Sequence, residues 1–72
     1  MAIADSTLTP ALLGRTVTLW STCAGFSFEH TGQVVGVLVA LPGTRATSSI
    51  LLEEGDRCDF FDSDHIDTLL IL

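Results

Sequence analysis

Positive charge is scarce in this sequence. It has no lysine, and its cations are three arginines, Arg15, Arg45 and Arg57, against nine carboxylates, which gives a formal net charge of −6 at pH 7. Contacts to phosphate supply most of the non-specific affinity for nucleic acids, and basic clusters attract proteins to anionic lipid surfaces. We therefore predict that the chain binds neither nucleic acid nor a membrane directly.

Long hydrophobic runs and cysteines are also few. The longest apolar stretch, residues 34–42, falls far short of the roughly 20 residues of a membrane-spanning helix. The first five residues lack the basic start and apolar run of a signal peptide. We therefore predict a cytoplasmic protein in which Cys23 and Cys58 are small buried thiols, although the sequence leaves a disulfide between them open.

Apolar side chains are abundant, at 47% of 72 residues with a mean hydropathy of +0.52. This content is too high for a disordered chain. A chain this short nevertheless buries only about 60% of the surface of its unfolded state, and small domains often gain stability by oligomerisation. We predict a flexible N-terminus over residues 1–7 and a single domain over residues 8–72.

A short helical turn is predicted ahead of the strands. Thr9 suits an N-cap, Pro10 the first helical position and Gly14 the residue after the last turn. This turn would place Leu12 and Leu13 against the core.

The remaining chain has the periodicity of β-strands. Residues 15–21 alternate between polar and apolar side chains. The run 32–41 is apolar on both parities, with Val35 and Val37 expected on one face, and Gly36 predicts a bend or bulge. Residues 22–31 fit either a loop or a short extra strand. The pattern also predicts strands over 48–54, 58–61 and 66–72, separated by turns over 42–45, 53–57 and 62–65.

About five antiparallel strands with a short 3₁₀-like link before the last one predict an all-β fold, a small SH3-like barrel. Two segments, Leu12-Leu13-Gly14-Arg15-Thr16-Val17-Thr18-Leu19 and Gly32-Gln33-Val34-Val35-Gly36, resemble the start of the Sm-like family. The resemblance implies a barrel that pairs strands into a ring or dimer. Residues 42–45 and 62–65 depart from that family's RNA-binding motifs, so a divergent Sm-like RNA-binding protein is only an alternative.

Carboxylates are concentrated in one stretch of the chain. Seven of the nine lie within residues 53–67 and would form one acidic face: Glu53, Glu54, Asp56, Asp59, Asp62, Asp64 and Asp67. Such a face would dock a basic protein, or imitate phosphates in an acidic decoy that inhibits a nucleic-acid-binding protein. Solvated side chains in turns are the simpler interpretation.

Part of this stretch contains ligand types for a divalent cation. The glycine that a calcium loop needs is missing after Asp64, and Asp62 or Ser63 capping a turn explains the same residues. The chain also has Cys23, Cys58, His30 and His65, but their spacing gives no nucleophile–base pair. We predict no metal, no cofactor and no enzymatic activity.

The apolar side chains exceed what one small core can hide. The final strand has apolar residues at consecutive positions from Leu69 to Leu72, so one parity faces away from the core, and an uncovered edge of that kind tends to pair. We predict a non-enzymatic interaction module that forms a homo-oligomer, in the simplest case a dimer, through Trp20, Leu70 and Leu72.

Overall fold

The computed structural model describes residue 3 and residues 7–72 of the chain. Most of the segment predicted to be flexible, residues 1–7, lies outside the described residues. Within the described residues, 3₁₀ helices and strands follow in the order η2 (Pro10–Leu12), β1 (Thr16–Cys23), β2 (Phe26–Leu38), β3 (Ser49–Glu54), β4 (Arg57–Asp62), η3 (Ser63–His65) and β5 (Ile66–Ile71). The all-β prediction and both helical turns are confirmed.

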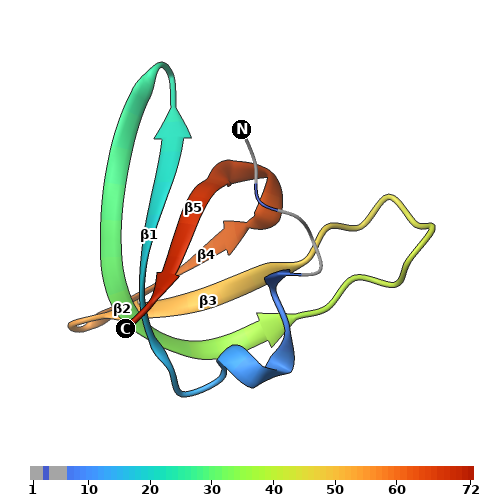
Figure 1. Ribbon diagram of the computed structural model, residues 1–72, viewed down its shortest axis with the longest axis horizontal. Coiled ribbons are helices and arrows are strands. Elements are labelled where there is room, and N and C mark those ends of the chain that lie inside the picture. The colour runs from blue at the N-terminus through green and yellow to red at the C-terminus, as the bar shows by residue number, and fades with distance from the viewer. Residues whose placement is uncertain (1–2, 4–6) are drawn as a thin grey trace.

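The strands form one antiparallel sheet in the order β4-β3-β2-β1-β5. The sheet curls strongly, so that β5 passes over β4 in the view of Figure 1. It does not close into a barrel, because β4 and β5 are its two edges and no ladder joins them. The predicted set of about five antiparallel strands is therefore present, but as an open sheet rather than a barrel, since η3 carries the chain from one edge to the other without laying β4 beside β5.

Strand β2 is shared by both halves of the sheet. Its first part pairs with β1 through Gln33, and its last part pairs with β3 from Gln33 onward. The bend needs Gly32, because a Cβ there would lie 2.3 Å from the carbonyl oxygen of Glu53. The two halves consequently wrap around a common core.

The bulge predicted at Gly36 is confirmed, because the register of β2 shifts between Val34 and Gly36. The extra residue in the bulge breaks the alternation of side chains. Val34 is fully buried and Val37 packs on the core, whereas Val35 is exposed. The prediction that Val35 and Val37 share a face is therefore wrong.

Residues 22–31 belong to a hairpin rather than to a loop. Strands β1 and β2 pair as far as Cys23 and Phe26, and the turn consists of Ala24 and Gly25. Both turn residues have positive φ, 52° and 82°, as a two-residue type I′ hairpin requires. The hairpin projects from the sheet as an arm (Figure 1).

The core consists of eight buried side chains: Leu8, Leu12, Val17, Leu19, Val34, Ile50, Leu52 and Ile66. Leu13, which was also expected here, is 51% exposed, because η2 ends at Leu12 and Leu13 lies in the turn that follows it. Cys23 and Cys58 are both free and exposed, so the prediction of buried thiols is wrong. No helix in the described part of the chain is long and apolar enough to span a membrane.

Candidate interaction surfaces

The register of β1 against β5 places the predicted contact residues on one face. Thr18 lies opposite Leu70, and Trp20 lies opposite Thr68. The backbone N–H of Leu72 donates to the carbonyl of Thr16 at 2.9 Å, which extends this ladder by one residue. Because side chains alternate along a strand, Trp20, Leu70 and Leu72 all lie on the outer face.

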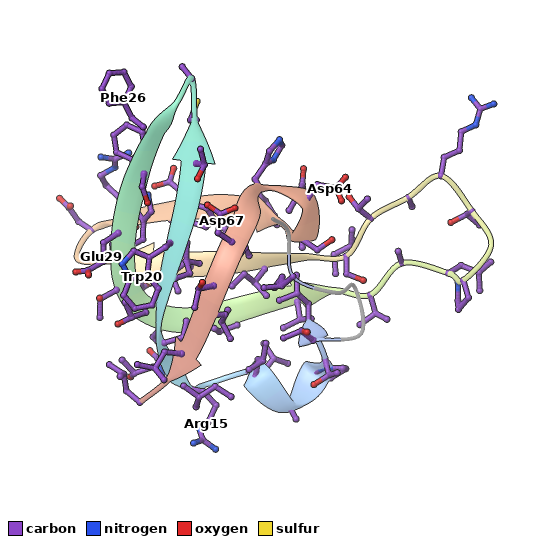
Figure 2. All side chains as sticks on the ribbon, turned by 45° about the horizontal axis from the view of Figure 1, so that its top comes forward. Arg15, Trp20, Phe26, Glu29, Asp64 and Asp67 are labelled. Carbon is purple, nitrogen blue, oxygen red and sulfur yellow. The ribbon has the colours of Figure 1, made fainter. Side chains whose placement is uncertain are left out.

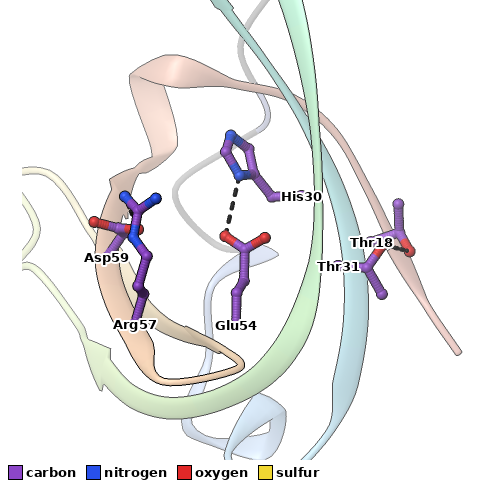
Figure 3. Close-up of polar contacts among 6 residues, drawn as sticks. All are labelled: Thr18, His30, Thr31, Glu54, Arg57 and Asp59. Atoms are coloured by element: carbon purple, nitrogen blue, oxygen red, sulfur yellow. Dashed lines mark hydrogen bonds and ion pairs between the residues drawn. The ribbon is translucent and has the colours of Figure 1, made fainter.

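Two threonine hydroxyls lie on the outer face of the β1–β2 ladder, which is the face that carries Trp20. Thr18 Oγ1 and Thr31 Oγ1 are 2.9 Å apart and hydrogen-bond to each other. Figure 3 shows this pair on the opposite side of the β1–β2 ladder from His30, which points into the curl of the sheet. One of the two hydroxyls donates to the other, which links β1 to β2 on this face.

The β5 edge of the sheet is apolar and uncharged from Thr68 to Leu72. Leu70 is 51% exposed and Leu72 is 61% exposed. In an antiparallel ladder, every second residue points its backbone N–H and C=O away from the partner strand. In β5, Leu69 and Ile71 point these groups toward the free edge of the sheet. Among the described residues, backbone pairing on this side is made only by Ile3, whose N–H donates to the carbonyl of Ile66.

The β4 edge carries charge along its length. Arg57 Nη2 lies 3.4 Å from Asp59 Oδ2, and Asp62 ends the strand. Phe60 is its most exposed apolar residue, at 69%, and follows Asp59 in the strand. The two edges of the sheet therefore differ in polarity.

The seven predicted acidic residues do not share one face. Glu53 and Glu54 are consecutive in β3, so their side chains point to opposite faces. Glu54 accepts a hydrogen bond from His30 Nδ1 at 3.0 Å (Figure 3), and Asp59 pairs with Arg57. The remaining carboxylates follow the chain from the β3–β4 turn to the start of β5: Asp56, Asp62, Asp64 and Asp67.

A pocket of about 250 Å³ opens between the end of β1 and the β4–η3 segment. Its wall contains two aromatic rings, a carboxylate, an imidazole and the exposed thiol of β1; the lining residues are Ser21, Thr22, Cys23, Phe60, Phe61, Asp62 and His65. His65 Nδ1 lies 3.9 Å from Asp62 Oδ2, which is too long for a hydrogen bond. The Asp62 carboxylate makes no capping hydrogen bond to η3 either.

Two further interactions hold the walls of this pocket. The Thr22 hydroxyl donates to the Asp67 carboxylate, which ties the arm to β5. This hydrogen bond holds the pKa of Asp67 below its ordinary value of 3.8. On the other side, the Phe61 ring packs on His30 with centroids 4.7 Å apart.

A second hollow, of about 400 Å³, lies between η2 and the loop after β2. Its walls are mainly apolar and carry no charged side chain; they are formed by Leu8, Thr9, Pro10, Val39, Ala40, Pro42 and Ser48. Its polar side chains are those of Thr9 and Ser48, and Ser48 Oγ accepts a hydrogen bond from the backbone N–H of Ala40. Of the two, the smaller pocket is the one that carries a carboxylate.

The candidate metal and catalytic residues are dispersed. Within the described ranges, no three His, Cys, Asp or Glu side chains come together in a way that would hold a metal ion. His30 is engaged with Glu54, whereas Cys23 and His65 line the same pocket. Sequence reasoning missed this pocket, because its walls come from segments about 40 residues apart that only the fold brings together.

Comparison of the chain with protein-family models, with curated proteins and with solved structures finds no match. The function is therefore argued from these surfaces alone.

Proposed function

We propose that this chain is a non-enzymatic protein-interaction module that forms a homodimer through β5 and presents carboxylates to a basic protein. The observation that carries the proposal is the uncharged, apolar β5 edge, with Leu70 and Leu72 more than half exposed. Soluble proteins protect edge strands with charge, proline or a covering segment. Pairing with a second copy would give β5 that protection.

A closed dimer follows from the symmetry of such a contact. Two β5 edges that meet antiparallel about a two-fold axis present the same residues to each other, so the assembly closes at two subunits. Covering a half-exposed leucine contributes on the order of 1 kcal/mol, and Leu70 and Leu72 would each occur twice in the contact. The sum offsets part of the entropy that association loses.

The fold supports the same proposal. Five antiparallel strands, a bent β2 common to both halves and the 3₁₀ link η3 before β5 suit an open sheet of the SH3-like or Sm-like type, whose members assemble through strand edges. The free thiols of Cys23 and Cys58 suit a reducing compartment, and we propose the cytoplasm.

A carboxylate surface that docks a basic protein is favoured over a nucleic-acid decoy. A decoy would have to present its carboxylates in a row, as phosphates stand along a nucleic-acid strand. Glu53 and Glu54 point to opposite faces of the sheet, and Asp59 is paired with Arg57. The carboxylates nearest the pocket are better placed to receive single basic side chains.

Sedimentation velocity over a dilution series that starts in the micromolar range tests the dimer. We expect a monomer–dimer equilibrium whose dimer fraction falls on dilution and is insensitive to salt, because the contact is apolar. A monomer at every concentration would contradict the proposal. A series of ever larger species would also contradict it, because that result requires an open head-to-tail contact.

A further inference from the structure

The pocket between β1 and the β4–η3 segment combines two features that rarely meet on a protein surface. The Phe60 ring stands largely in solvent on one wall. Beside it, the Asp62 carboxylate is half exposed, with 49% of its side chain accessible. The pocket therefore offers an aromatic surface and an acceptor that no side chain of the described protein occupies by a hydrogen bond.

The size of the pocket limits what it can hold. Its volume of about 250 Å³ lies below the roughly 300–1,000 Å³ of sites that bury a drug-sized ligand. The opening is therefore suited to one side chain of another molecule rather than to a cofactor.

The charge around the pocket selects a cation. Asp64 lies in η3 beside His65, and Asp67 follows at the start of β5, where it hydrogen-bonds to Thr22 of the pocket wall. Figure 2 shows Asp64 and Asp67 at this side of the molecule, with Arg15 at the opposite end. Arg57 is paired with Asp59. Within the described residues, the basic side chain that comes near Asp62 is His65, whose Nδ1 lies 3.9 Å from Asp62 Oδ2 and which carries a charge only when protonated. The recess is therefore negative and partly apolar, and no arginine of the described chain pairs with Asp62.

We propose that this pocket binds an arginine side chain of a basic protein partner. The guanidinium plane stacks on an aromatic ring, here Phe60, while its fork of N–H groups donates to a carboxylate in bidentate geometry, here Asp62. The aliphatic stem of arginine covers apolar surface, here the remaining apolar part of the pocket wall. Lysine matches this arrangement less well, because its ammonium group is a compact, strongly hydrated charge.

The arginine site rests on one part of the proposed function, the binding of a basic protein, and specifies the residues and the side chain that would make that contact. It does not depend on the β5 contact, since Leu70 and Leu72 do not line the pocket. A chain that fails to dimerise can still bind arginine, and the two failures are distinguishable.

The test is an NMR titration of the isotope-labelled full chain with three blocked tripeptides, Gly-Arg-Gly, Gly-Lys-Gly and Gly-citrulline-Gly. Citrulline has nearly the shape of arginine without its charge. We expect the arginine peptide to produce saturable shifts of the backbone amides of Thr22, Cys23 and residues 60–65. We expect the lysine peptide to bind more weakly and the citrulline peptide to cause no saturable shift.

Two variants with the same change in charge locate the site. Asp62→Asn should weaken binding of the arginine peptide about tenfold, because it removes a charge-assisted pair. Asp56→Asn, in the β3–β4 turn, should leave the affinity unchanged. Phe60→Ala should also weaken binding, and the dispersion of each spectrum reports whether the variant is folded.

Several results would overturn the inference. Equal losses in Asp62→Asn and Asp56→Asn would show that only net charge matters. Equal affinity for arginine and lysine would remove the role of the planar guanidinium. Saturable shifts with citrulline, or shifts confined to another surface, would show that this pocket does not recognise a cation.

Discussion

The two edge strands of this sheet have similar lengths and opposite characters. Strand β4 carries charge at three of its six positions, with Arg57 and Asp59 on one parity and Asp62 at its end. Strand β5 carries one carboxylate at its start, Asp67, and no charge from Thr68 onward. Natural sheets protect edges by placing charges on them, so β4 follows this rule and β5 departs from it.

This difference in charge suits the two edges to different kinds of contact. The charged β4 edge resists pairing with another strand and places Phe60 and Asp62 at a pocket that can receive a single side chain. The apolar β5 edge offers backbone groups and leucines to a whole strand. The predictions below test this comparison, beginning with the bend that holds the two edges apart.

Gly32→Ala should have the largest effect. A Cβ at this position would lie 2.3 Å from the carbonyl oxygen of Glu53, so β2 and β3 have to separate. We expect a loss of about 3 kcal/mol in the free energy of unfolding, which is a large part of the stability of a small domain. Urea unfolding followed by Trp20 fluorescence measures this loss.

Gly36→Ala is the matched control for that experiment. Its Cβ would meet a side-chain carbon, Leu51 Cβ, at 3.2 Å, and a side chain can move. We expect a loss of about 1 kcal/mol or less. If the two variants lost similar amounts of unfolding free energy, the close approach of Gly32 to the backbone of Glu53 would not limit which residue fits there.

Leu70→Lys compared with Phe60→Lys tests the two edges directly. A lysine at position 70 enters the proposed dimer contact twice, and we expect dimer affinity to fall on the order of 100-fold. A lysine at position 60 should leave dimerisation unchanged, although Phe60 is the more exposed residue. Sedimentation equilibrium of both variants gives the constants, and dissociation by Phe60→Lys alone would assign the contact to β4 instead.

Glu54→Ala should have a smaller effect on stability. Glu54 and His30 join the hairpin arm to the β3–β4 half of the sheet through one partly buried hydrogen bond of 3.0 Å. Losing it should lower the free energy of unfolding by about 1 kcal/mol. The neighbouring Glu53→Ala alters an exposed carboxylate on the opposite face and should change stability by less than about 0.5 kcal/mol. A larger loss in Glu53→Ala would contradict the role given to Glu54.

Local patterns in the sequence were sufficient to predict β1, β3, β4, β5 and most turns, whereas β2 spans Phe26–Leu38 rather than the predicted residues 32–41. Gly55 takes positive φ in the β3–β4 turn, and η3 forms where a polar segment interrupts two apolar runs. The N-terminal turn ends at Gly14, which also has positive φ. These features depend on neighbouring residues, whose chemistry is visible in the sequence.

Features that depend on distant contacts could not be predicted in the same way. Gly36 predicts a bulge, but its effect on the side chains, which puts Val35 and Val37 on different faces, was not predicted. The hairpin turn uses Ala24 at positive φ, which an alanine seldom adopts. Whether the sheet closes depends on the relative directions of β4 and β5. The pocket joins Thr22 to His65, and no spacing between those positions indicates that they meet.

The smallest expected effect concerns the start of β5, where its one carboxylate lies. The Thr22 hydroxyl donates to Asp67 and lowers the pKa of that carboxyl below 3.8. Thr22→Val removes this donor, so the pKa of Asp67 should rise toward its ordinary value, which a carboxyl ¹³C NMR titration measures directly. Thr16→Val, at the other end of β1, should leave it unchanged.

The sign of the accompanying stability change follows from linkage. A carboxyl whose pKa is lower in the folded state stabilises that state above the pKa of the unfolded chain, and this contribution disappears as the pH falls through the folded pKa. The native chain should therefore be slightly more stable than Thr22→Val at neutral pH, and the two should converge below pH 3.8. If the native chain stays more stable than Thr22→Val in acid, the hydrogen bond to the ionised Asp67 is not the cause. Thr22 would then stabilise the start of β5 by packing instead.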